Sequence, residues 1–141
     1  EMVLRQLQFL PTASHRSELT ETDRGVAIVD DTYNANPPGA KSAIESAAEL
    51  AKERGGSLFV VTPGMVELGT LQYQRNRELA EQVSEAGGTL YAVGLTNRKA
   101  LVDGLSRSAK LFLTRDDAVG AVNQVAGSGD VILYENDLPD H

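Results

Sequence analysis

The chain has 141 residues, of which 41% are hydrophobic and 23% are charged, as in one globular domain with a substantial core. Its formal net charge of -7 and its lack of tryptophan argue against nucleic-acid binding, which favours basic surfaces and aromatic stacking platforms. The absence of cysteine excludes disulfides, thiolate metal sites and a cysteine nucleophile. No apolar run is long enough to span a membrane, and the first residues do not resemble a secretory signal. We therefore expect a cytoplasmic protein without a membrane partner.

The amino-terminal segment differs from the rest of the chain. Residues 1–13 have the pattern of the end of a helix that Pro11 stops, so we expect them to belong to a preceding domain or a linker. Residues 14–141 then form the domain itself. Its first feature, the alternating sequence SELTET at 17–22, is compatible with an exposed antiparallel edge strand.

Short apolar runs alternate with helical patterns along the remaining sequence. Runs rich in Val, Ile and Leu, without polar alternation, are typical of strands buried on both faces of a parallel sheet. Such runs lie at 26–30, 58–62, 90–94 and 131–135, with a weaker one at 110–114. Amphipathic helices are predicted between them: one that begins at Pro37 or Pro38 and stops at Gly55, and three more over about 72–86, 97–107 and 118–126. This order predicts an α/β fold: a Rossmann-like, open and mostly parallel sheet of about five to six strands with helices on both faces.

Ligands of an open α/β sheet bind beyond the carboxyl ends of the strands, close to the helix N-termini. The candidate loops are 30–39, 62–70, 94–98 and 134–140. In the first, Asp30 and Asp31 can accept hydrogen bonds from ribose hydroxyls or face a metal ion, and Asn34 and Asn36 offer amides. The helix N-terminus that follows favours anions. Asp and Asn also occupy ordinary turns, but five polar residues within seven positions favour a binding site.

Two further loops carry unusual residues. The loop TPGMVELGT (62–70) contains Gly64 and a single acid, Glu67, and suits a ligand-binding loop and a plain turn equally well. The composition of ENDLPDH (135–141) by itself favours a disordered acidic tail. The chain has no GxxxxGK[ST] or GxGxxG phosphate motif. Its two histidines are too isolated in the sequence for a metal site or a catalytic triad, so we expect no metal ligands here.

Three motifs, in this order and spacing, resemble the C-terminal domain of the Mur ligases, enzymes that make the cytoplasmic peptide stem of peptidoglycan. They are HRSE (15–18), VDDTYNANP (29–37) and MVELG (65–69). The resemblance is strongest to the branch that adds D-alanyl-D-alanine to UDP-N-acetylmuramoyl-tripeptide. It covers most of the chain from His15 onward.

The resemblance implies a three-domain ligase that uses ATP with Mg²⁺, whose phosphate loop and Mg²⁺ ligands lie in a preceding central ATPase domain. The present domain would be a mobile lid that completes the ATP site and presents the amine substrate to the UDP-linked muramoyl peptide. Closure would expel water from a hydrolysable intermediate, and the isolated domain is expected to be inactive. The residues implied on the nucleotide side are Arg16, Asp31, Asn34 and Asn36, and those on the acceptor side are Gly64, Glu67, Glu135, Asn136 and Asp137.

The chain departs from the pattern of this branch at two places. The branch usually has GDM before ELG, whereas this chain has PGM at 63–65, so that Gly64 stands where an acid is usual. After the last strand the branch shows KGS and continues into a helix, whereas this chain has YENDLPDH. Two alternatives therefore stay open: a related ligase with a different acceptor, and a non-catalytic α/β binding module.

Overall fold

The computed structural model describes residues 18–31, 37–65, 68–105 and 109–135, and one six-stranded sheet forms its centre. The strands follow one another across the sheet in the order β1-β2-β6-β3-β4-β5. They are β1 (Glu18–Glu21), β2 (Ala27–Asp31), β3 (Leu58–Thr62), β4 (Thr89–Val93), β5 (Lys110–Phe112) and β6 (Val131–Glu135). All neighbouring pairs are parallel except β1 and β2, which are antiparallel. The predicted mostly parallel sheet and its antiparallel edge strand are confirmed.

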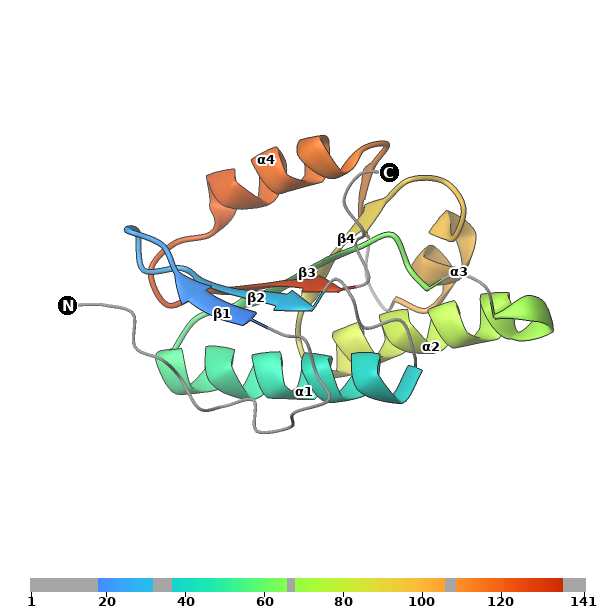
Figure 1. Cartoon of the computed structure of the whole chain (residues 1–141), viewed down its shortest axis with the longest axis horizontal. Helices are drawn as coiled ribbons and strands as arrows, with labels where there is room; N and C mark the ends of the chain where they lie inside the picture. The colour runs from blue at the N-terminus through green and yellow to red at the C-terminus, as the bar shows by residue number, and fades with distance from the viewer. Residues whose placement is uncertain (1–17, 32–36, 66–67, 106–108, 136–141) are drawn as a thin grey trace.

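Helices cover both faces of the sheet, as expected from the alternation of strands and helices. They are α1 (Pro37–Arg54), α2 (Gln72–Glu85), α3 (Arg98–Asp103) and α4 (Arg115–Val125), with a short 3-10 turn at Gly69–Leu71 before α2. In Figure 1, α1 and α2 run along one face of the sheet and α4 runs along the other. The short helix α3 packs beside α2.

The core has two layers, because successive side chains of a strand point to opposite faces. Leu133 of β6 belongs to a buried cluster with Ile44 of α1, whereas its neighbour Ile132 belongs to a second cluster with Val122 of α4. Every residue of β6 is buried. This double burial explains why VILYE shows no polar alternation in the sequence.

The ends of the helices follow local chemistry. At the start of α4, the Thr114 side chain accepts a hydrogen bond of 3.1 Å from the Asp117 amide. The acidic residues in the first turn of α4 also interact favourably with the positive end of the helix dipole. The helix predicted over about 97–107 is shorter in the structure and ends at Asp103. A Cβ atom at Gly104, the next residue, would lie 2.2 Å from the Arg77 carbonyl oxygen. The chain leaves α3 so close to α2 that only glycine fits there.

Candidate functional site

The carboxyl ends of β2, β6, β3 and β4 lie side by side, because these four strands are parallel neighbours. Their register aligns Val61 with Tyr134 and Thr62 with Ala92. The loops that follow them are the four that the sequence predicted as candidates. The strand order brings the carboxyl ends of the four strands, from which these loops start, to one edge of the sheet (Figure 1).

Two acidic residues end adjacent strands at this edge. Asp31 is the last residue of β2 and is in register with Glu135, the last residue of β6. Neighbouring strands of a sheet lie about 4.8 Å apart, so the two backbones are in direct contact there. The Glu135 side chain is fully buried. Alternation along β6 places Glu135 on the same face as Leu133, which is the face that α1 covers.

Most of the predicted site residues lie outside the described part of the chain. Of the nucleotide-side residues, the structure describes the backbone of Asp31, and of the acceptor-side residues it describes Gly64 and Glu135. The predictions that fall outside the described residues are those for Arg16, Asn34, Asn36, Glu67, Asn136 and Asp137.

The loop after β3 requires glycine at position 64. The Gly64 amide donates a 3.0 Å hydrogen bond to Thr62 Oγ1, and its φ of +86° lies in the left-handed region that side-chain-bearing residues rarely adopt. A Cβ atom at this position would lie 2.7 Å from Asn76 Oδ1 and 2.7 Å from Asn97 Nδ2. An acid, which the resembling branch usually has here, has no room in this loop. Glycine at position 64, in place of the usual acid, therefore fits the packing of Asn76 and Asn97 around this loop.

Three amide side chains surround this loop, and we call Gln72, Asn76 and Asn97 the amide cluster. Asn76, on α2, accepts a 2.7 Å hydrogen bond from the Met65 amide and donates one of 2.9 Å to the Met65 carbonyl. Asn97 donates through Nδ2 to the Pro63 carbonyl at 3.0 Å and to the Met65 carbonyl at 3.1 Å. Backbone groups that have no strand or helix partner are thus satisfied by side chains.

Gln72, the first residue of α2, reaches both sides of the same loop. Its Nε2 donates to the Met65 carbonyl at 2.7 Å, and its Oε1 accepts from the Leu68 amide at 3.2 Å. The same nitrogen donates to Asn97 Oδ1 at 2.8 Å, which connects the loops after β3 and β4. The amide cluster therefore joins two neighbouring strand ends into one hydrogen-bonded unit.

Sequence reasoning missed the amide cluster, although part of the signal was present. Asn97 occupies the N-cap position of α3, where asparagine is common, but its side chain makes no capping hydrogen bond. Asn76 lies on the inner face of α2 with Leu79, Ala80 and Val83, and it is fully buried. A polar residue in phase with an apolar helix face is the pattern that could have revealed it.

A second polar contact links α2 to α3 on the outside of the molecule. The Tyr73 hydroxyl donates a hydrogen bond to the Asp103 carboxylate, and Lys99 Nζ donates a second one to it at 3.3 Å. The hydrogen bond from Tyr73, together with the bond from Lys99, lowers the pKa of Asp103 below its ordinary value. The same hydrogen bond raises the pKa of Tyr73. This contact helps to hold α3, and with it Asn97, against α2.

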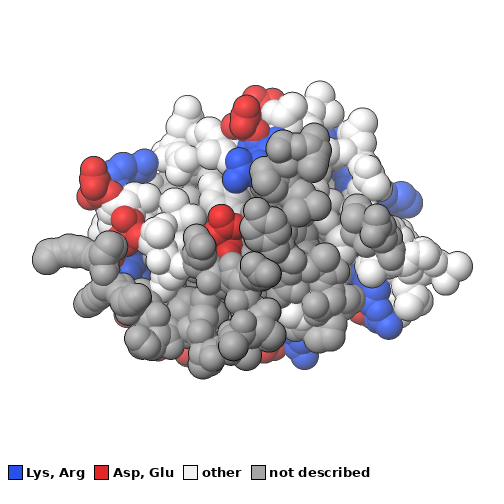
Figure 2. All heavy atoms as spheres, viewed as in Figure 1, with Lys and Arg blue, Asp and Glu red and all other residues white. Residues whose placement is uncertain are grey.

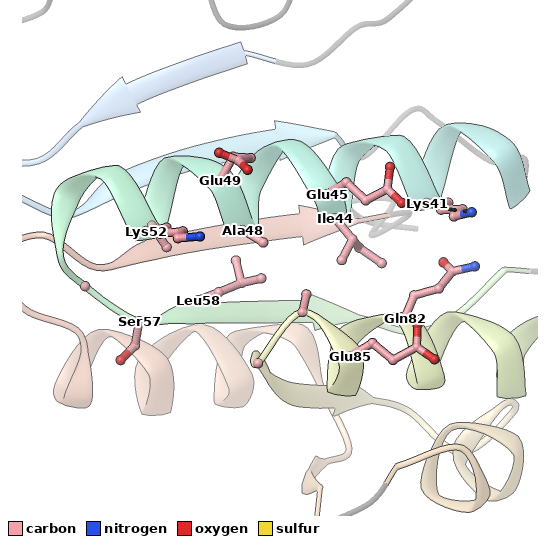
Figure 3. A pocket seen from close by; sticks show the side chains of 14 residues that line it. Lys41, Ile44, Glu45, Ala48, Glu49, Lys52, Ser57, Leu58, Gln82 and Glu85 are labelled. Atoms are coloured by element: carbon pink, nitrogen blue, oxygen red, sulfur yellow. Dashed lines mark ion pairs between the residues drawn. The ribbon is translucent and has the colours of Figure 1, made fainter.

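A groove of about 720 Å³ lies between α1 and α2, apart from the strand carboxyl ends. Figure 3 shows Lys41, Glu45 and Lys52 of α1 on one side and Glu85 of α2 on the other, with Ser57 at the amino end of β3. Lys41 Nζ is 3.9 Å from a Glu45 carboxylate oxygen, which is an exposed pair of small energetic weight. Both signs of charge line the groove, so it has no marked preference for a charged ligand.

The surface charges and the possible metal ligands of the described residues do not indicate a second binding site. On the face shown in Figure 2, the described acidic and basic residues are interspersed and form no broad patch of one sign. Among the described residues, no three His, Asp or Glu side chains are grouped so that they could hold a metal ion. The helices in the described ranges are too short or too polar to cross a membrane.

Comparison with known proteins agrees with the fold. Residues 15–134 match the family model described as "Mur ligase, glutamate ligase domain". The UDP-N-acetylmuramoyl-tripeptide–D-alanyl-D-alanine ligase of Bacillus subtilis (strain 168) is 29% identical over 140 residues, which are 96% of this chain and 30% of that ligase. The ligase of the same name from Mycobacterium tuberculosis (strain H37Rv) is 25% identical, over 91% of this chain and 27% of its own length. The chain thus spans less than a third of these relatives.

Solved structures show the same architecture. The MurF ligase of Thermotoga maritima, in complex with ADP, superimposes with a TM-score of 0.74 and 26% identity, over 91% of this chain and 28% of that one. A MurF structure from Acinetobacter baumannii has a TM-score of 0.68 at 21% identity, over 89% and 27% of the two chains, and supports the fold. Since the family model matches most of the chain and the fold agrees, the chain belongs to the Mur ligase family, as its C-terminal, glutamate ligase domain.

Proposed function

We propose that this domain is the lid and substrate domain of an ATP-dependent ligase that joins D-alanyl-D-alanine to a UDP-linked muramoyl peptide during peptidoglycan precursor synthesis. The observation that carries the proposal is the similarity to UDP-N-acetylmuramoyl-tripeptide–D-alanyl-D-alanine ligases over nearly the whole chain, with 29% identity to the Bacillus subtilis enzyme. The position of Asp31, Gly64 and Glu135 at one edge of the sheet supports it.

The chemistry of such a ligase couples ATP cleavage to amide formation. The peptide carboxylate takes the γ-phosphoryl group of ATP and releases ADP, and the amine nitrogen then attacks the resulting acyl phosphate. The new C–N bond forms as the C–O bond to phosphate breaks, and the amine proton passes to a base. The Mg²⁺ ligands and the phosphate loop are expected in a preceding central domain, which is also the proposed partner of this one. Closure of the lid protects the acyl phosphate from water.

The nucleotide would bind at the carboxyl end of β2. Asp31 ends this strand, and the helix that follows, α1, has no acidic residue in its first turn. A helix N-terminus without acids keeps its partial positive charge available to phosphate groups, which suits an anionic nucleotide. In the proposal Asp31 holds the ribose hydroxyls. Arg16, Asn34 and Asn36 complete this side of the site.

The acceptor amine would bind on the neighbouring side of the same edge. Glu67 and the segment that contains Asn136 and Asp137 are the proposed contact residues there. Glu135 is fully buried at the end of β6, so its proposed role is to support this side from within the sheet. Gly64 shapes the loop that precedes Glu67, through its left-handed backbone.

A ligase of the same family with a different acceptor is the second candidate, and Gly64 favours it. The loop has no space for the acid that the branch specific for D-alanyl-D-alanine usually carries at this position. The acceptor can be identified with the intact ligase, by measuring phosphate release with ATP, the UDP-linked peptide and each candidate amine. Turnover with D-alanyl-D-alanine and with no other amine would support the first candidate. Turnover with a single amino acid as the amine would support the second.

The remaining parts of the proposal concern context. We place the domain boundary at residues 13 and 14, with residues 1–13 as a linker or the end of the central domain, and the family match that begins at residue 15 agrees with this position. A ligase that acts on nucleotide-linked precursors with ATP is expected to work in the cytoplasm.

The nucleotide role of Asp31 can be tested by substitution in the intact ligase. Asp31→Ala is expected to lower kcat/KM for ATP by about 10- to 100-fold, the value of a hydrogen bond to a charged group, while the free energy of unfolding changes little because the residue lies at a strand end. The matched control is Asp23→Ala, an exposed aspartate in the turn between β1 and β2, at the opposite edge of the sheet. Unchanged turnover in Asp31→Ala would contradict the nucleotide role.

A further inference from the structure

Helix α3 is too short to be stable by itself. It has six residues, fewer than the roughly 12 that a helix in water needs, and its N-cap residue makes no side-chain capping hydrogen bond. Two of its residues, Ala100 and Leu101, are buried. The stability of α3 must therefore come from contacts with neighbouring parts of the chain.

The N-terminus of α3 is attached to a turn that is far from it in the sequence. We call residues 63–65 the β3 turn, because they follow the last residue of β3. Asn97 Nδ2 donates to the Pro63 carbonyl at 3.0 Å and to the Met65 carbonyl at 3.1 Å. Asn97 Oδ1 accepts a 2.8 Å hydrogen bond from Gln72 of α2. One buried side chain thus connects α3, the β3 turn and α2.

The β3 turn depends on the same contacts. The Met65 amide donates to Asn76 at 2.7 Å, and the Met65 carbonyl accepts hydrogen bonds from all three residues of the amide cluster. The Met65 side chain is buried in the core cluster that also contains Leu101 of α3. The turn and the helix therefore share polar and apolar contacts, and releasing one of them weakens the contacts of the other.

The strands beside these two elements are held differently. β3 pairs with β6 on one side and with β4 on the other, through a backbone ladder. Elements that lack such a ladder open locally at a lower free energy than the central strands of a sheet. Opening of α3 and the β3 turn is therefore expected to leave the sheet intact.

We infer that α3 and the β3 turn form one conformational unit, joined by Asn97, which opens and closes as a whole while the sheet stays closed. A unit of this kind links its two parts, so a ligand that restrains the β3 turn at the strand ends also restrains α3, and the reverse. The inference does not rest on the proposed function, because it concerns motions of the chain without substrate.

Tyr73→Phe tests the unit from the C-terminal end of α3. The Tyr73 hydroxyl donates to Asp103, the last residue of α3, and phenylalanine removes this hydrogen bond alone. Hydrogen exchange of the backbone amides, followed by NMR, reports the opening. The amides of Leu101 and Gly104, whose hydrogen bonds belong to α3, should exchange about three- to tenfold faster, which is the effect of losing one ordinary hydrogen bond.

The decisive readout is the β3 turn, which this substitution does not alter. If the unit opens as a whole, the Gly64 and Met65 amides exchange faster by the same factor as those of α3. The matched control is Gln74→Ala, since Gln74 is exposed on the same helix and its side chain donates to Glu78. This control should leave all of these amides unchanged. Faster exchange in α3 with an unaltered β3 turn would overturn the inference.

Asn76→Leu tests the unit from the other end. Leucine has a similar volume but removes both hydrogen bonds of Asn76 to Met65, and within the described residues the Asn76 side chain bonds to none of α3. The Leu101 and Gly104 amides of α3 should nevertheless exchange faster, together with those of the β3 turn. Acceleration of the turn alone would contradict the inference.

The two variants together leave a definite result. If Tyr73→Phe changes neither α3 nor the β3 turn, Asn76→Leu decides alone, and if neither variant changes them, the inference is wrong. In either variant, an equal acceleration of the amides of β3 and β6 would mean that α3 opens only with the sheet, which also overturns it.

Discussion

The substitution Gly64→Ala probes the loop after β3 most directly. It adds one methyl group at a residue whose φ is +86°, and the added carbon would lie 2.7 Å from Asn76 Oδ1 and 2.7 Å from Asn97 Nδ2. A Cβ atom essentially never lies this close to another heavy atom, so the amide side chains must move. Their hydrogen bonds to Met65 are then weakened or lost.

The expected cost combines the two effects. A left-handed backbone costs alanine about 1–2 kcal/mol, and the loss of about two buried hydrogen bonds costs roughly 1 kcal/mol each. We therefore expect Gly64→Ala to lower the free energy of unfolding by about 3–4 kcal/mol, a large part of the roughly 5–15 kcal/mol typical of a domain. Guanidinium chloride unfolding of the chain, followed by far-ultraviolet circular dichroism, measures this as a lower midpoint at an unchanged slope.

Gly87→Ala separates the two effects. Gly87 follows α2 with a φ of +79°, but an added Cβ atom there would meet no atom within 4 Å. It should therefore cost only the backbone part, about 1–2 kcal/mol. If Gly64→Ala costs no more than Gly87→Ala, the crowding around Gly64 is without effect and the reasoning is wrong.

Three further outcomes test the fold around the site. Gly120→Ala in α4 should raise the free energy of unfolding by about 0.5–1 kcal/mol, because the position is helical and an added Cβ atom would meet no other atom there. A thermal unfolding midpoint that does not rise would contradict this. Asp130→Ala should lower it by about 2 kcal/mol, because this carboxylate accepts 2.8 Å hydrogen bonds from two backbone amides, and a chemical unfolding curve like that of the parent would disprove it. Tyr73→Phe should raise the pKa of Asp103 toward its ordinary value. The stabilisation by Asp103 is present above the ordinary pKa and is lost as pH falls through the lowered one, and an NMR titration in which the Asp103 pKa stays unchanged would refute the assignment.

The strands were predictable where burial is complete. The runs LFVVT and VILYE coincide with β3 and β6, because both faces of these strands are covered and the positions before their last residues favour apolar side chains. The edge strand β5 is shorter than the predicted 110–114, since Thr114 is already used as the N-cap of α4. The order of the strands was not predictable, because alternation of strands and helices does not say which strands become neighbours.

The position of the strand ends that carry the candidate site was predictable, and the side-chain contacts around them were not. The carboxyl ends of the strands follow from the topology of any open α/β sheet, so the loops after β2 and β3 could be chosen without a structure. The amide cluster could not, since Asn97 bonds to the Pro63 carbonyl 34 residues away, and a sequence gives no register between such segments. The roles of all nine predicted site residues remain predictions, and six of the nine residues lie outside the described ranges.

The place of β6 in the sheet has a consequence for how the domain folds. β2 and β3 do not pair with each other, and each pairs with β6. Ala27 therefore pairs with Val131, a residue that is far from it in the sequence. During synthesis, the sheet cannot close until residues 131–135 have left the ribosome. Contacts between such distant segments form slowly, and the apolar strands made earlier stay exposed in the meantime. Among the described strands, β6 is the last to be synthesised, and it therefore governs when the earlier apolar strands are buried and protected from aggregation.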